Sequence, residues 1–307
     1  MIRNRKLAVL LLALAGCLAG SPAFAQQQLP QSQSQSQSKT ASDGVQVREK
    51  SRALALASAE EVERAAAGQY AQLKRDAMAQ GALAPADYVQ TQRLRAIANR
   101  IIPFAPRFNE RAAQWKWEVN LIGSKQINAF CMPGGKIAFF SGILTTLKLT
   151  DDEVAVVMGH EMAHALREHG RARVGKERLA QGATVAASVL SSLLGYGNIG
   201  GQLANGAAKL TLLKYSRDDE SEADLVGLDL AARAGFDPRA GIVLWQKMAA
   251  AAKGAPPQWL STHPSNDQRT AEIEKHLKET LPLYAKATGR DLAALGPYPA
   301  TAAPPVR

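Results

Sequence analysis

The chain has 307 residues, of which 46% are hydrophobic, and it carries a formal net charge of +10. This length and composition exclude a chain that is disordered throughout, because one or two domains of this size can bury a core. Two cysteines, Cys17 near the start and Cys131, exclude a framework of several disulfides. The basic excess is mild and no nucleic-acid-binding module is visible, so nucleic acid is not expected as a partner.

The first 25 residues have the three parts of a secretory signal peptide. MIRNRK is basic, LAVLLLALAGCLAG is apolar but short for a membrane span, and A-F-A fits cleavage before Gln26. A second processing site competes with this one, because L-A-G-C resembles a bacterial lipobox in which Cys17 would carry a lipid anchor. Both alternatives predict a periplasmic protein, either soluble or lipid-anchored to a membrane.

A Gln/Ser-rich tract at 26–45 predicts a disordered tether, because it contains too few apolar residues to offset the entropy of ordering. Helices are expected at 58–81, where Ser58 and Glu61 form a capping box, and at 86–101 before Pro103.

Alternation of apolar and polar residues at 115–122 predicts a strand. The stretch INAFCMPGGKIAFF predicts a hairpin that turns at Pro133-Gly134-Gly135. Thr150 and Glu153 form another capping box, ahead of a long helix that Gly170 would end.

The uncharged segment 179–208 is expected to form a helical hairpin that is buried or docked near the functional site, with membrane contact as the alternative. Further helices are expected near 217–234 and 238–252, and a last one from about 265 that ends before Pro282. A loose tail at 282–307 would follow.

The long helix carries the motif H-E-M-A-H. His160 and His164 are four residues apart, so on a helix both imidazoles can point at one ion. A catalytic zinc takes three protein ligands and a water, and Glu161 would lie near that water as a proton acceptor. A chance match of this short motif is the alternative, and a third ligand decides between the two.

The candidate third ligand lies in YSRDDESEADLVG, where Glu220 and Asp224 are again one helical turn apart. Glu220 would complete a His-His-Glu site for one zinc ion per chain. Asp224 has two alternative roles, which are to fix the tautomer of a ligand imidazole or to donate a proton during catalysis. Three neighbouring acidic residues are expected on a solvated face: Asp218, Asp219 and Glu222.

H-E-M-A-H, followed 56 residues after His164 by E-S-E-A-D, resembles metallopeptidase family forty-eight, and NAFCMPGGKIAFFSGIL, AGFDP and STHPSNDQR match it as well. The resemblance covers about residues 85–280 and is nearest to the periplasmic BepA and LoiP branch rather than to HtpX or the CAAX prenyl proteases. It implies a gluzincin-type α+β fold, mostly helical with a small antiparallel sheet. It also implies zinc ligation by His160, His164 and Glu220, with Glu161 as base and Asp224 as proton donor.

The resemblance implies a zinc-dependent endopeptidase that hydrolyses unfolded or misassembled cell-envelope proteins. The alternative is a chaperone-like factor of the outer-membrane assembly machinery with a latent or structural zinc site. The expected organisation is therefore a signal peptide at 1–25, a tether at 26–45, a metallopeptidase domain at 46–281 and a flexible tail at 282–307. Membrane contact would come through the lipid anchor or the 179–208 segment.

Other histidines, one cysteine and one arginine are further candidates for a role near this site. His263 matches a loop histidine of the family; it would be a fourth ligand that keeps the enzyme latent until the loop moves, a transition-state hydrogen-bond donor, or a structural residue. His169 and His276 are expected to be solvated. Cys131 is expected to be a half-buried apolar residue, with metal coordination as the alternative. Arg269 is expected in a structural salt bridge, with an ion pair to an acidic site residue as the alternative.

Overall fold

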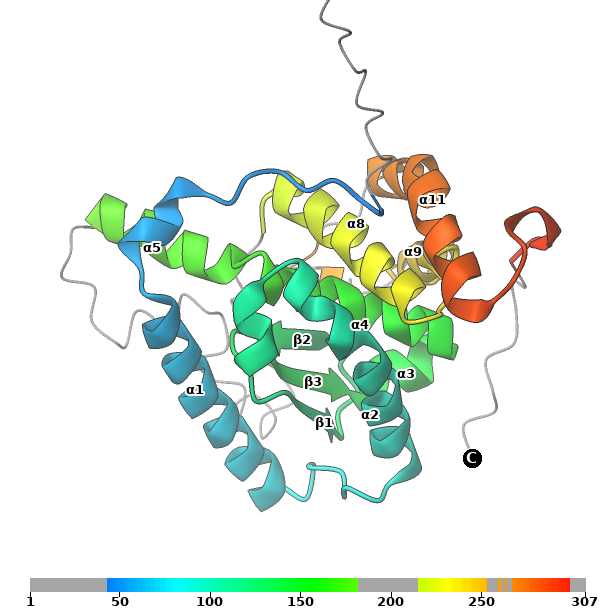
Figure 1. Cartoon of the computed structure of the whole chain (residues 1–307). Coiled ribbons are helices and arrows are strands. Elements are labelled where there is room, and N and C mark those ends of the chain that lie inside the picture. Colours follow the sequence, from blue (N-terminus) through cyan, green and yellow to red (C-terminus); the bar gives the residue numbers. More distant parts are fainter. Residues whose placement is uncertain (1–42, 182–214, 253–258, 261–262, 264–266, 299–307) are drawn as a thin grey trace, which may run out of the picture. The chain divides into compact units, whose positions relative to one another are not determined.

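The computed structural model describes residues 43–181, 215–252, 259–260, 263 and 267–298 (Figure 1). Within these ranges the fold is mostly helical α+β with one small sheet, as predicted. The expected signal peptide, most of the expected tether, nearly all of the 179–208 segment and the end of the tail lie outside the described residues.

The described elements follow the predicted order closely. The strands are β1 (Glu118–Ile122), β2 (Ala129–Met132) and β3 (Lys136–Phe140). The α-helices are α1 (Ala59–Ala79), α2 (Val89–Ile101), α3 (Ser141–Leu147), α4 (Asp151–Leu166), α5 (His169–Gln181), α8 (Arg217–Arg233), α9 (Ala240–Ala251) and α11 (Asp267–Thr288). Short 3-10 turns are η1 (Arg52–Leu56), η2 (Ile102–Arg107), η3 (Glu110–Gln114) and η4 (Leu292–Ala294).

The sheet has the strand order β1-β3-β2 and is mixed. β2 and β3 form the expected antiparallel hairpin, and Gly134 and Gly135 in its turn have φ values of 81° and 78°, which favour glycine. β1 pairs with β3 in parallel, so the prediction of an antiparallel sheet is wrong for this pair. The reason is that β2 begins at the end of the sheet where β1 finishes and runs in the opposite direction. β3 turns back from β2 and lies between the two strands, so it runs in the same direction as β1.

Helices cover both faces of the sheet, which explains why nearly every strand residue is buried. Alternate residues of β3 belong to two separate apolar clusters. Ile137 and Phe139 pack with residues of α2, α4 and α8, whereas Ala138 and Phe140 pack with residues of α1. The sheet thus forms the middle layer between α1 and α4, the helix that carries the H-E-x-x-H motif (Figure 1).

Local capping fixes where α4 and α8 begin. The Thr150 side chain accepts a hydrogen bond from the backbone of Glu153, whose carboxylate accepts one from the Thr150 backbone, so the predicted capping box is confirmed. Ser216 and Asp219 form the same reciprocal pair at the start of α8. Both helices that supply the candidate site therefore start at a defined residue.

The end of α4 differs from the prediction that Gly170 would terminate it. α4 ends at Leu166, and α5 already begins at His169, so Gly170 lies inside α5. Glu168 takes the left-handed conformation at the junction, with a φ of 59°. Its carboxylate is held by Lys50, at 2.9 Å, and by Arg171. One long-range and one local ion pair thus support a conformation that glycine usually supplies.

The last helix also differs from its prediction, because α11 continues through Pro282 to Thr288. A proline inside a helix removes one backbone hydrogen bond and is costly. Leu283 and Tyr284, which follow it, are buried in a small cluster with Ala232 of α8. Burial of these side chains offsets the missing hydrogen bond.

α4 and α8 cross at two glycines, and this crossing brings the candidate site together. A Cβ atom added to Gly159 would lie 2.6 Å from the carbonyl oxygen of Gly227, and one added to Gly227 would lie 2.6 Å from the amide of His160. Only residues without a side chain permit such a close approach. The crossing therefore places the imidazole of His160 beside the first turns of α8.

Lys148 offers a test of the local backbone energetics. It follows α3 in the left-handed conformation, with a φ of 47°, and its side chain is exposed. Lys148→Gly should therefore raise the free energy of unfolding by about 1 kcal/mol, because glycine adopts this conformation without strain. Urea unfolding measures the change, with Lys148→Ala as the control that keeps the strain. An unchanged or lower stability of the glycine variant would contradict the expectation.

No helix in the described ranges is apolar over a long enough stretch to span a membrane.

Candidate metal centre

His160 and His164 project from the same face of α4, one turn apart, as the motif predicts. Both are buried, with exposed fractions of 2% and 3%. Their Nε2 atoms lie 3.1 Å apart, and the two rings meet edge to face. The imidazoles therefore converge on one point rather than on solvent.

Two more residues complete the cluster. Glu220, in the first turn of α8, places its carboxylate oxygens 3.6 Å from His160 Nε2 and 3.5 Å from His164 Nε2. His263 Nδ1 lies 3.1 Å from His160 Nε2 and 3.0 Å from a Glu220 oxygen. The four ligand atoms all lie within 4.8 Å of one another, and all four residues are buried. The structure thus brings together three predicted ligands and the predicted fourth.

The spacing of these atoms fits a tetrahedral zinc ion. Nitrogen and oxygen ligands about 2.0 to 2.2 Å from a tetrahedral zinc are separated from each other by roughly 3.3 to 3.6 Å. Five of the six ligand pairs have separations of 3.0 to 3.6 Å, which lie around this value. Burial, together with the neighbouring imidazoles, lowers the pKa of His164 well below its usual value. His164 is therefore neutral and has a lone pair available for a metal.

Glu161 lies next to this cluster on α4. Its Oε1 atom accepts a 2.6 Å hydrogen bond from the indole N–H of Trp259 and lies 3.6 Å from His263 Nε2. The carboxylate is 3% exposed. Glu161 is thus held beside the cluster by Trp259, a residue that the sequence analysis did not single out. In the sequence, Trp259 lies four residues before His263, and this spacing is the signal that could have identified it.

Asp224 lies behind His160. Its Oδ1 atom is 3.0 Å from His160 Nδ1, whereas the Nε2 atom of the same ring faces the other ligands. Burial raises the pKa of Asp224, but the Arg269 guanidinium and the bond to His160 outweigh this and lower it to about 2. An ionised carboxylate in this position accepts the Nδ1 proton and leaves Nε2 free for a metal.

Arg269 of α11 connects two of the acidic residues of α8, Asp224 and Glu220. It bonds both oxygens of Asp224 at 2.7 Å and one oxygen of Glu220 at 2.8 Å. Its guanidinium also lies 3.8 Å from the ring centre of Trp245. Arg269 therefore pairs with acidic residues of the site, which is the alternative to the structural salt bridge that was expected.

His169 and Glu222 were both expected to be solvated, and both expectations are wrong. His169 is 6% exposed and lies 2.9 Å from His164 Nδ1, while its other nitrogen lies 2.9 Å from Glu222. Glu222 is 8% exposed, although Asp218 is solvated as expected. The sequence gives no local reason to separate these acidic residues, because the difference comes from the packing of α8 on α4 and α5.

Cys131 takes no part in the cluster. It is 4% exposed, on β2, and burial raises the pKa of its thiol well above the usual value. It is a buried apolar residue, more deeply buried than expected.

Comparison with known proteins places these residues in a family context. Residues 89–277 match the family model described as Peptidase family M48, and this range contains all four cluster residues. Mitochondrial metalloendopeptidase OMA1 of Arabidopsis thaliana is 37% identical over 173 residues, which are 55% of this chain and 33% of that protein. OMA1 of Schizosaccharomyces pombe is 38% identical over 167 residues, 53% of this chain and 48% of that protein.

The beta-barrel assembly-enhancing protease of Yersinia pestis is 30% identical over 218 residues, 67% of this chain and 42% of that protein. This chain thus spans a third to a half of the length of the relatives it matches. The identities to the mitochondrial proteins are the higher ones. The comparisons therefore do not single out the expected BepA and LoiP branch.

Proposed function

The chain belongs to peptidase family M48, and from this premise we propose that it is a zinc metalloendopeptidase that binds one zinc ion through His160, His164 and Glu220. The observation that carries the proposal is the buried convergence of these ligands with the Glu161 carboxylate beside them. When bound, zinc supplies a Lewis acid that polarises a scissile carbonyl and acidifies water. Glu161 would accept the proton of the attacking water and return it to the leaving amine.

Asp224 is better suited to positioning than to proton donation. Its carboxylate bonds the side of the His160 ring that faces away from the cluster, and Arg269 bonds both of its oxygens. Its low pKa keeps it ionised at neutral pH. We therefore assign it the role of fixing the His160 tautomer.

His263 supports the proposal of a latent resting state. Catalytic zinc sites keep one position for water, whereas four protein ligands close a site. His263 Nδ1 lies 3.1 Å from His160 Nε2 and 3.0 Å from a Glu220 oxygen, which is close to the separation of two ligands on one zinc ion. His263 would therefore occupy the fourth position. Activity would then require His263 to leave that position.

The metal itself provides the direct test. The purified full-length protein should contain about one zinc ion per chain and should hydrolyse casein. Removal of zinc by a chelator should abolish hydrolysis, and added zinc should restore it, since the ligands alone cannot activate water. Elemental analysis and a casein assay measure the two quantities. A protein that cleaves casein equally well without any metal would refute the proposal.

An extended segment of an unfolded polypeptide is the proposed substrate. Leu83 forms a bridge to Ile122, so the β1 edge of the sheet is already occupied, and β2 forms the other edge beside α4. A peptide added along β2 would lie next to the helix that carries the cluster. Unfolded or misassembled envelope proteins offer such segments, and we propose quality control of these proteins as the role.

A chaperone-like assembly factor with a structural zinc is the second candidate, and the closed set of four ligands favours it. Such a factor would depend on the zinc ligands but not on Glu161. The comparison of assembly activity with proteolysis in a Glu161 variant, argued in the Discussion, separates the two candidates.

We propose a periplasmic location, supported by the basic and apolar segments at the start of the sequence. Mass spectrometry of the mature N-terminus distinguishes cleavage before Gln26 from lipidation at Cys17. An unprocessed N-terminus in the native host would contradict export.

A further inference from the structure

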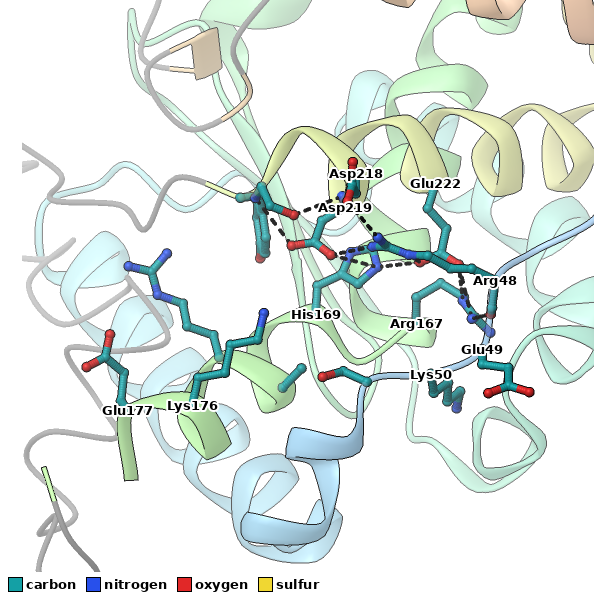
Figure 2. A pocket seen from close by; sticks show the side chains of 15 residues that line it. Arg48, Glu49, Lys50, Arg167, His169, Lys176, Glu177, Asp218, Asp219 and Glu222 are labelled. Carbon is teal, nitrogen blue, oxygen red and sulfur yellow. Dashed lines mark hydrogen bonds and ion pairs between the residues drawn. The ribbon is translucent and has the colours of Figure 1, made fainter. Parts of the chain in front are cut away.

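We propose that His169 and Glu222 are positioning residues that fix the tautomer of His164 and thereby strengthen its bond to the metal. The inference rests on the proposed zinc site and extends it to a second group of residues. These residues come from the start of α5 and from α8, and Arg48 in the segment before η1 completes the group (Figure 2).

The two nitrogens of His164 face different partners. Its Nε2 atom faces His160 and Glu220, and its Nδ1 atom lies 2.9 Å from Nδ1 of His169. A metal ligand must present a lone pair, so a metal on Nε2 requires the proton on Nδ1. His164 Nδ1–H must then donate to His169, whose own Nδ1 has to be the acceptor.

Glu222 determines where the second nitrogen of His169 places its proton. With Nδ1 as acceptor, the neutral ring carries its proton on Nε2. That atom lies 2.9 Å from Glu222 Oε2, and a carboxylate accepts such a proton. Each donor in the series from His164 through His169 to Glu222 therefore meets one acceptor, and the order cannot be reversed while a metal occupies Nε2 of His164.

Two arginine side chains hold the Glu222 carboxylate. Arg167 donates to Glu222 Oε1 from Nε at 3.1 Å, and Arg48 donates to Glu222 Oε2, also at 3.1 Å. Two cations from different parts of the chain thus keep the carboxylate in place, as Figure 2 shows.

The group lies on the Nδ1 side of His164, whereas His160 and Glu220 lie on its Nε2 side. His169, Arg167 and Glu222 line a polar pocket of about 540 Å³, and none of the four cluster residues lines it. Tyr215 stacks on the His164 ring with 3.9 Å between the centres, so it also restricts the orientation of that ring. His169 and Glu222 would therefore act on the metal through the hydrogen bond to His164.

The two histidine ligands are thus supported differently. Asp224 bonds His160 directly, whereas Glu222 reaches His164 through an intervening imidazole. Loss of a hydrogen-bond partner behind a ligand commonly weakens metal binding by about 10- to 100-fold. Without an acceptor at Nδ1, His164 can hold its proton on Nε2, and that form does not bind a metal.

His169→Leu and His169→Asn form a matched pair, because leucine and asparagine have the same shape and only asparagine offers an oxygen near the former Nδ1 position. The zinc dissociation constant of the full-length protein is measured by competition with a chromophoric chelator at pH 7. We expect the leucine variant to bind zinc about 10- to 100-fold more weakly than wild type, with the asparagine variant recovering a large part of this loss. Circular dichroism of the zinc-free proteins verifies that both variants fold.

Arg48→Leu and Arg52→Leu test the far end of the group without a core substitution. Arg48 donates to Glu222, whereas Arg52, the first residue of η1, is exposed, and the ion pairs of Glu222 are with Arg48, Arg167 and His169. Arg48→Leu should weaken zinc binding several-fold, and Arg52→Leu should not change it. This pair carries the test if His169→Leu fails to fold.

Wild-type zinc affinity in both Arg48→Leu and a folded His169→Leu would overturn the inference and leave the proposed function intact. Equal losses in the leucine and asparagine variants would also overturn it, because the acceptor would then not matter. A wild-type protein that binds no zinc would refute the proposed function and this inference together.

Discussion

Glu161→Gln should abolish casein hydrolysis while leaving about one zinc ion bound per chain. Removal of a general base typically slows a reaction by about 10²- to 10⁴-fold, and a neutral amide cannot accept the proton of water. The substitution keeps the size of the side chain, and the amide oxygen can still accept the hydrogen bond from Trp259. Initial rates of casein cleavage and elemental analysis measure the two properties on the same preparation.

Glu110→Gln is the matched control, because Glu110 is exposed in η3 and distant in sequence from the cluster. It should retain wild-type activity and zinc. Casein cleavage at the wild-type rate by a pure Glu161→Gln protein would overturn the assignment of the base. If the variant loses proteolysis but keeps normal assembly activity in cells, the chaperone-like candidate is favoured for that activity.

Arg269→Met should lower the free energy of unfolding by about 3 to 5 kcal/mol, which is the usual cost of removing one partner of a buried ion pair. Arg269 is 3% exposed and bonds both Asp224 and Glu220. Methionine fills a similar volume but leaves two buried carboxylates without this cation. The pKa of Asp224 should therefore rise, and its bond to His160 should weaken.

Urea unfolding of the zinc-free and zinc-loaded protein measures the loss. A bound cation would compensate part of the charge of Glu220, so the loss should be larger without zinc. Lys275→Met on the same helix is the control, since Lys275 and its partner Glu272 are exposed, and a surface pair contributes at most about 1 kcal/mol. Similar stabilities of the two variants would contradict the view that Arg269 neutralises the site.

Several features could be predicted from the sequence because they depend on chemistry within a few residues. The capping box at Thr150, the turn at Gly134-Gly135 and the common face of His160 and His164 all follow from backbone geometry over three or four positions. The spacing of Glu220 and Asp224 indicated Glu220 as the candidate third ligand, and the family resemblance implied the same role. The structure places it within the ligand cluster.

Other features depended on contacts between distant segments. Asp218 and Glu222 have similar side chains on one helix, yet only Glu222 is buried, because α4 and α5 pack on that side of α8. His169 follows a charged stretch, and its burial results from the left-handed turn at Glu168, which Lys50 stabilises from 118 residues away. The parallel pairing of β1 with β3 also depends on contacts between separate segments of the chain.

The sequence by itself determined where helices begin, where the hairpin turns and which residues could bind a metal, since these follow from short-range hydrogen bonding and side-chain spacing. Only the tertiary structure decided which polar residues are buried and what they contact. That choice depends on which surfaces meet when the core forms, as at the Gly159–Gly227 crossing, where α4 approaches α8 closely enough to bring His160 to Asp224. The metal centre is therefore encoded locally as two motifs and assembled by packing.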